Sequence, residues 1–151
     1  MLETLLAPPF AADPPIKLNV PAKTLGLVLA ILGAVSVLFG VLGVFALLGL
    51  SALATAFGGI FLLAAIGVII GVIGAIVETW GAYQMYQGNR DGKRLAIYGL
   101  LINVAGSLVA TIGGSGGLGG WIVGVLISFV VYYLIVISRF PDEPPVVAKT
   151  T

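Results

Sequence analysis

Charged side chains are missing from most of this chain. No Asp, Glu, Lys or Arg occurs in the 54 residues from Thr24 to Val77, or in the 44 residues from Leu95 to Ser138. Only 9% of the residues are charged, whereas soluble domains carry about 25%. A water-soluble domain needs a charged exterior, so this pattern excludes one and predicts an integral membrane protein.

Cysteine and histidine are absent altogether. Ser-His and Cys-His catalytic pairs are therefore excluded. Haem, zinc, copper and iron–sulfur centres normally use His or Cys ligands, so we expect no metal and no cofactor. A net charge of +1 provides no basic field for nucleic acid. We predict a protein that is not an enzyme and whose partners are membrane lipids, other integral membrane subunits or itself.

The two uncharged stretches are each long enough for two membrane spans, since a span needs about 20 apolar residues. We predict an all-α integral membrane protein with four transmembrane helices, arranged as two hairpins. Proline-rich tails of residues 1–23 and 141–151 flank this domain. The four helices are expected at about residues 24–48, 56–87, 95–112 and 121–140.

Glycine-rich segments mark the expected turns between the helices. The first turn lies near Gly49–Gly59, where Ser51 and Thr55 are further candidate breakers. Residues 88–92, with the sequence Gly-Asn-Arg-Asp-Gly, are a strong signal for the second turn. Residues 113–120 contain six glycines in eight positions and predict a flexible third turn.

All seven basic residues are expected on one side of the membrane. With four spans, the N-terminal tail, the middle turn and the C-terminal tail lie on the same side, and the other two turns carry no charge. The positive-inside rule places both tails and the middle turn in the cytoplasm. We therefore expect a protein of the inner membrane with cytoplasmic tails. The seven residues are Lys17, Lys23, Arg90, Lys93, Arg94, Arg139 and Lys149.

Aromatic residues at the ends of the spans fit this orientation. Trp80, Tyr83, Tyr86 and Tyr98 would form the cytoplasmic aromatic belt, and Trp121 would mark the opposite interface.

Glycines recur every seven residues in the first two expected helices. Residues at this spacing share one helix face, and small residues allow close helix approach in lipid. This face either packs inside the four-helix bundle or forms an oligomerisation surface. The candidate packing glycines are Gly26, Gly33 and Gly40 in the first helix and Gly67, Gly71 and Gly74 in the second.

Few polar residues interrupt the spans. Glu78 continues the glycine face of the second helix, and an ionisable group there is a candidate for cation or proton binding. Alternatively, it pairs with Lys93 or Arg94 across the middle turn. Asn103 could bond a neighbouring helix or contact a ligand. Together with Ser128 and Tyr132, these two residues define a candidate polar interior of the bundle.

The middle turn is the largest polar surface in the sequence. Arg90, Lys93 and Arg94 would attract anionic lipid headgroups, at roughly 1 kcal/mol each near the surface, or a cytoplasmic partner. They also suffice to fix the topology.

These observations favour a non-catalytic accessory or scaffold subunit that packs within a larger membrane complex or homo-oligomer. The alternative is a small transporter or ion-conducting oligomer that uses Glu78 and the Asn103 face. Lipid or quinone binding is a third hypothesis, because apolar ligands need no ionisable residues.

The orientation can be tested with single cysteines, because the chain has none of its own. A membrane-impermeant maleimide should label Ser115→Cys only from the non-cytoplasmic side and Asn89→Cys only from the cytoplasm. Labelling of Ser115→Cys from the cytoplasm would overturn the assignment.

Overall fold

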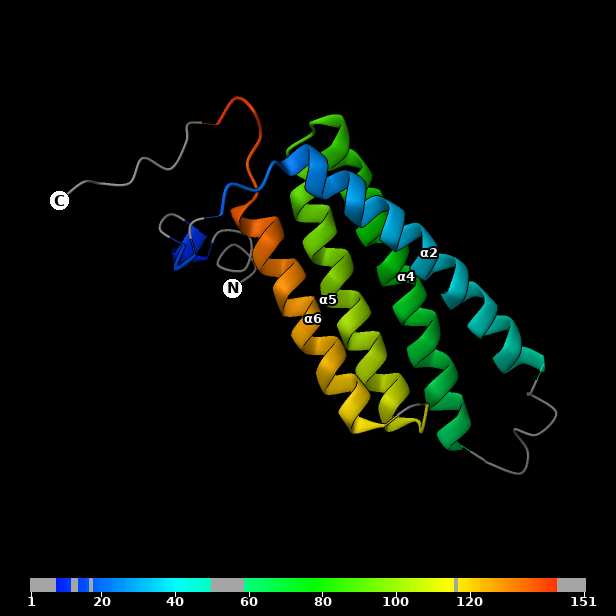
Figure 1. The fold of residues 1–151 in the computed structure, drawn as a ribbon. Coiled ribbons are helices and arrows are strands. Elements are labelled where there is room, and N and C mark those ends of the chain that lie inside the picture. The colour runs from blue at the N-terminus through cyan, green and yellow to red at the C-terminus, as the bar shows by residue number, and fades with distance from the viewer. Residues whose placement is uncertain (1–7, 12–13, 17, 50–58, 116, 144–151) are drawn as a thin grey trace.

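The computed structural model is built almost entirely of helices (Figure 1). It describes residues 8–11, 14–16, 18–49, 59–115 and 117–143. The expected breakers Ser51 and Thr55, and the expected helix start at residue 56, lie outside these ranges. A short 3-10 helix is followed by four long helices: η1 (Pro9–Ala11), α2 (Ala22–Gly49), α4 (Gly59–Gln87), α5 (Asp91–Ile112) and α6 (Leu118–Ile137).

The four long helices are each long and apolar enough to cross a membrane. Their outward surfaces carry large hydrophobic side chains that water would not tolerate in such number. Phe39 and Phe45 on α2 are 67% and 65% exposed, and Leu126 and Phe129 on α6 are both 61% exposed. These features indicate a multi-pass membrane protein.

Helices α4 and α5 pack against each other along their whole length, in antiparallel directions. Seven positions of α4 face six positions of α5 and Gly113, the residue that follows it, in alternating steps of three and four residues, and we call these fourteen positions the seam. On α4 the seam consists of Ala64, Gly67, Gly71, Gly74, Glu78, Gly81 and Met85, and on the α5 side of Gly92, Ala96, Gly99, Asn103, Gly106, Ala110 and Gly113.

Glycine is required at several of these positions because the two backbones nearly touch. A methyl group added to Gly74 would lie 2.8 Å from the Cα of Asn103, and one added to Gly92 would lie 2.6 Å from the carbonyl oxygen of Gly81. Such close approach replaces the hydrophobic drive that is missing between helices in lipid. Repeating steps of three and four favour a gently coiled, left-handed pair.

Helix α2 packs on α4 through its own seven-residue glycine repeat. A methyl group on Gly26 would lie 2.6 Å from the backbone nitrogen of Tyr86, and one on Gly40 would lie 2.7 Å from a methyl group of Val72. Between them, Gly33 faces Thr79. The glycines at positions 26, 33 and 40 thus all lie against α4.

The ends of the central helices are set by glycines with positive φ. Gly88 has φ +88° and Gly114 has φ +84°, a conformation that costs other residues strain. At the first end, Asn89 N–H donates to the Gln84 carbonyl over 2.9 Å and Gly88 N–H donates to that of Met85 over 3.0 Å. This is the Schellman arrangement, which satisfies carbonyls that the helix leaves unpaired.

Several helix boundaries differ from those expected from the sequence, and α6 already begins at Leu118 rather than at residue 121. Helix α5 begins at Asp91 rather than Leu95, where the side-chain oxygen of Asn89 accepts the Asp91 N–H over 3.0 Å. Helix α6 ends at Ile137 rather than Phe140, since Ser138 is already extended. Pro141 disfavours helix at the residue before it, and the Arg139 backbone pairs with residues ahead of α2 instead.

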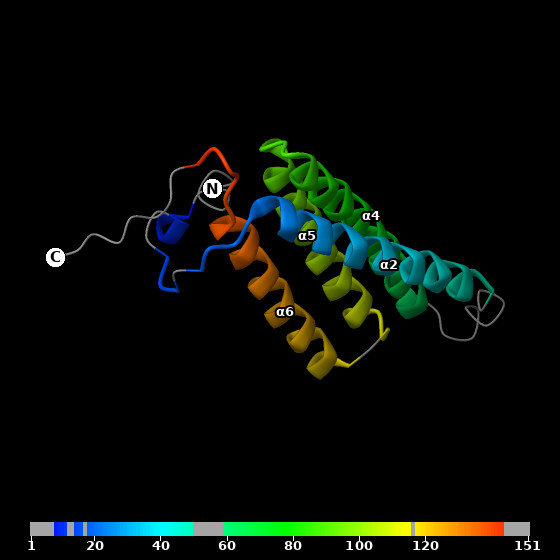
Figure 2. The ribbon, with the colours of Figure 1, turned by 45° about the horizontal axis from the view of Figure 1, so that its top comes forward.

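Helices α2 and α6 meet at one end of the bundle and diverge toward the other (Figures 1 and 2). We call the end where α2 begins and α6 ends the tail end, and the opposite one the loop end. At the tail end, Ala22 N–H donates to the Arg139 carbonyl over 2.7 Å, and Arg139 N–H donates to that of Val20 over 2.9 Å. Phe10 also stacks on Tyr133, with ring centroids 5.8 Å apart.

The seam predicts opposite effects for two neighbouring glycines. Gly74→Ala should destabilise the protein by about 1–3 kcal/mol, the usual cost of overpacking, because the new methyl group meets the α5 backbone. Gly71→Ala should be neutral or stabilising, because a methyl group there meets nothing within 4 Å and alanine favours a helix. Unfolding in mixed detergent micelles measures both; equal stability of the two variants would contradict the close approach.

Candidate functional site

A cavity of about 330 Å³ lies between the four long helices, toward the loop end. It exists because α2 and α6 diverge there and because glycines line it, among them Gly40, Gly71 and Gly124. A methyl group at Gly71 or Gly124 would meet no other atom within 4 Å, so these positions leave space unfilled. The polar residues lining the cavity are Ser36, Asn103, Ser107, Thr111, Ser115 and Trp121.

Polar side chains run along one wall of this cavity at four-residue intervals. Asn103, Ser107 and Thr111 share one face of α5, and Ser115 extends this row beyond the end of the helix. Asn103 is the thirteenth of 22 residues in α5, so the row runs from the middle of the helix to the loop end.

Each hydroxyl group that lines the cavity donates a hydrogen bond to a backbone carbonyl of the protein. Ser107 donates to the Val104 carbonyl and Thr111 to that of Ser107, each over 2.8 Å. Ser115 donates to the Ala110 carbonyl over 2.9 Å, and Ser36 donates to its own helix over 3.0 Å. The four hydroxyl oxygens therefore face the cavity as hydrogen-bond acceptors only.

Two donors in the cavity have no partner among the described residues. The indole nitrogen of Trp121 is buried there without a hydrogen bond. The Asn103 amide, which is partly buried, makes no hydrogen bond to any described residue either. Buried donors are rarely left unpaired in native structures, so the Trp121 indole distinguishes the cavity from ordinary packing.

A compact apolar core closes the bundle on the tail side of the cavity. Met85, Ile135 and Ala96 are fully buried there, and Phe140 is 3% exposed. The core therefore lies between the cavity and the tail end, and the helices diverge at the other end.

Glu78 lies between this core and the cavity. It occupies the seam position opposite Gly99, seven residues after Gly71, which lines the cavity, and seven before Met85, which lies in the core. Residues seven apart share a helix face, so Glu78 is on the cavity side of α4. It is not itself among the residues lining the cavity.

The expected pairing of Glu78 with Lys93 or Arg94 is not found among the described residues. Lys93 instead donates to the Ser138 carbonyl, and its ammonium lies 5.3 Å from the ring centre of Phe140. The seam sets Arg94 level with Tyr83, so Glu78 lies about 7.5 Å deeper along α4 than Arg94.

The four residues of the expected polar interior do not form one cluster. Of the four, Asn103 alone lines the cavity. Ser128 is partly buried on α6. Tyr132 packs against the apolar core, with its ring centre 6.4 Å from that of Phe129.

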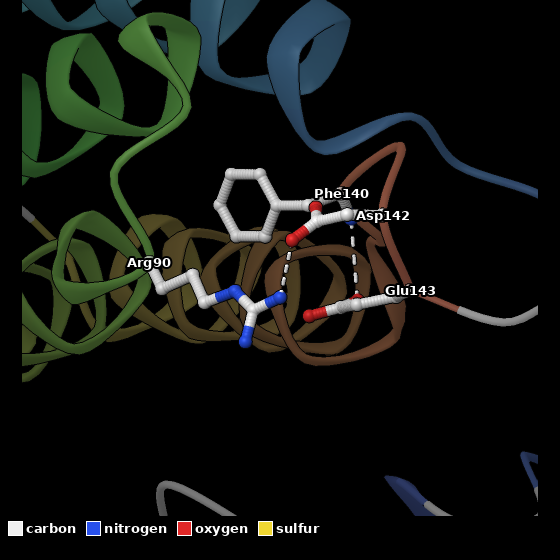
Figure 3. Close-up of polar contacts among 4 residues, drawn as sticks. All are labelled: Arg90, Phe140, Asp142 and Glu143. Carbon is white, nitrogen blue, oxygen red and sulfur yellow. Dashed lines mark hydrogen bonds and ion pairs between the residues drawn. The ribbon is translucent and has the colours of Figure 1, made fainter.

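The middle turn is tied to the segment that follows α6. The Arg90 guanidinium forms an ion pair with Asp142 at 2.5 Å, and Phe140 N–H donates to Glu143 over 3.2 Å (Figure 3). A backbone hydrogen bond, and then the bond from Arg90, hold the pKa of the Asp142 carboxyl below its usual range. Both side chains are more than 60% exposed, so this pair contributes little stability.

A second, apolar groove lies on the outer side of the α2–α4 contact. Its volume is about 790 Å³, and its lining is mainly apolar. Two alanines and the exposed rings of Trp80 and Tyr83 are among its lining residues. The lining residues are Ala30, Ala34, Val37, Ile76, Thr79, Trp80 and Tyr83.

The serine and threonine row of α5 is the part of the site that the sequence-based interpretation missed. The four-residue spacing from Asn103 to Ser115 was the signal that could have found it. No sequence pattern indicated that Ser36 lines the cavity, because its position there depends on how α2 crosses α4.

No protein-family model, curated protein or solved structure matches this chain.

Proposed function

We propose that this protein is a non-catalytic membrane subunit that packs against a transmembrane helix of another subunit or of a second copy of itself. In this proposal its tails face the cytoplasm and the two uncharged turns face the opposite side of an inner membrane. The observation that carries it is the apolar groove between α2 and α4.

The groove has the features of a helix-docking surface in lipid. Ala30 and Ala34 are spaced as small residues are in close transmembrane contacts, so a partner backbone can approach there. Trp80 is 56% exposed and Tyr83 is 43% exposed at the border, and aromatic side chains bury a large contact area. Residues of both α2 and α4 line the groove, so a partner helix seated there would contact the two helices together.

Cross-linking tests this docking surface. A cysteine at Ala34 should cross-link to a membrane partner, or to a second copy, with a short bis-maleimide in native membranes. Leu126→Cys on α6, which is 61% exposed in the native protein, is the matched control and should remain largely uncross-linked. Mass spectrometry of the product identifies the partner, and equal yields at both positions would argue against a specific groove.

A second candidate function, a small transporter or ion-conducting oligomer, is favoured by the position of Glu78. A carboxylate inside a membrane span usually marks an ion or proton pathway. Here it lies on the cavity side of α4, between the cavity and the apolar core at the tail end. A solute entering from the loop end would first meet the row of polar side chains from Ser115 to Asn103 and then Glu78.

Flux measurements separate this candidate from the first. In reconstituted vesicles, Glu78→Gln should reduce proton or cation flux to the level of empty vesicles, because the neutral amide cannot exchange a proton or hold a cation. Asp91→Asn, which removes an exposed acid outside the seam, should leave flux unchanged. Equal flux in Glu78→Gln and the native protein, with both fully assembled, would eliminate a transport role for Glu78.

A further inference from the structure

We infer that the cavity between α2, α4, α5 and α6 is a binding site for a small uncharged molecule with a carbonyl oxygen on an apolar body. This inference is independent of the docking groove, which lies on the other side of the α2–α4 contact.

The size and charge of the cavity limit what it can hold. About 330 Å³ lies at the lower end of the range for small-molecule sites, which is roughly 300–1,000 Å³. None of its lining residues is Asp, Glu, Lys or Arg. A charged ligand would therefore lack a counter-charge in a low-dielectric setting, so an uncharged ligand fits.

The unpaired donors specify the chemistry of the ligand. The Trp121 indole N–H and the Asn103 amide N–H groups face the cavity without partners among the described residues. Every hydroxyl that lines the cavity already donates to a backbone carbonyl. The site thus offers free donors to an acceptor atom, and a carbonyl oxygen is an uncharged acceptor that such N–H groups bind.

The rest of the lining is apolar and open toward the divergent end. Val68, Val72 and Ala75 line the cavity beside its glycines. An apolar body would contact these residues while its carbonyl reaches the Asn103 and Trp121 donors. Two sources supply this chemistry: a free molecule such as a quinone, and the ester group of a glycerolipid.

Trp121 itself reports on the site. The chain has two tryptophans, so the full-length Trp80→Phe protein has Trp121 as its single indole. This variant is purified in an alkyl maltoside, because that detergent has no carbonyl group. In one arm of the experiment the variant is titrated with a decyl-1,4-benzoquinone. In the other arm it is titrated with a diester phosphatidylcholine, and a diether analogue serves as the reference. We expect a saturable change in Trp121 emission in one of the two arms and none with the diether lipid.

Substitutions that fill the cavity or remove a donor should abolish or weaken this response. Gly124→Leu places a side chain in the open cavity and should abolish saturable binding. Asn103→Leu should weaken it at least tenfold. Gly43→Leu, also at an open position but outside the cavity lining, should bind as the parent does. Gly71→Leu fills the same cavity from α4 and replaces Gly124→Leu if that variant is unstable.

The two arms distinguish the source of the carbonyl group. Saturation by the quinone alone identifies a free carbonyl compound as the ligand, and saturation by the diester lipid alone identifies a bound lipid. A response that is linear in concentration in both arms, or that persists in both filling variants, would overturn the inference and leave a cavity that holds water only. The Trp121→Phe protein, whose single indole is Trp80, gives the linear response expected of an indole outside the site.

Discussion

The close approach of α4 and α5 is the contact on which the rest of this structure depends. In lipid no hydrophobic force brings two helices together, so they associate through packing at short range. Gly74 and Gly92 allow the two backbones to approach so closely that a single methyl group would not fit. Helix α2 then packs on this pair through its own glycines, and α6 closes only the tail end. The antiparallel pair is thus the frame, and the cavity and the groove are spaces left around it.

Four helices could be predicted from the sequence because two long stretches without charge are incompatible with a surface that faces water. The sequence also indicated that Gly26, Gly33 and Gly40 form a helix face of small residues, and these glycines lie against α4. The continuation of the seven-residue repeat in α5, from Gly92 through Gly99 and Gly106 to Gly113, is visible in the sequence. Taken together with the repeat in α4, it would have predicted that these two helices pair with each other.

The cavity could not be predicted in the same way, because it depends on how the helices diverge. Helix divergence follows from packing across the bundle rather than from periodicity within one segment. Trp121 marked a membrane interface in the sequence, but only the three-dimensional arrangement turns its indole toward unfilled space. The expected polar interior failed to form one cluster for a related reason. Ser128 and Tyr132 lie on α6 but do not line the cavity, and Tyr132 packs against the apolar core at the tail end instead.

The two polar residues of the seam each face a glycine, and this determines where their side chains go. The backbone of Asn103 is pressed against Gly74, and that of Glu78 against Gly99. Neither side chain has room to lie between the helices, so each must leave the seam sideways. For Asn103 this direction is the cavity. The glycines that bring α4 and α5 together therefore also place an amide and a carboxylate on the cavity side of the pair. One packing requirement accounts for both the stability of the frame and the polarity of the space beside it.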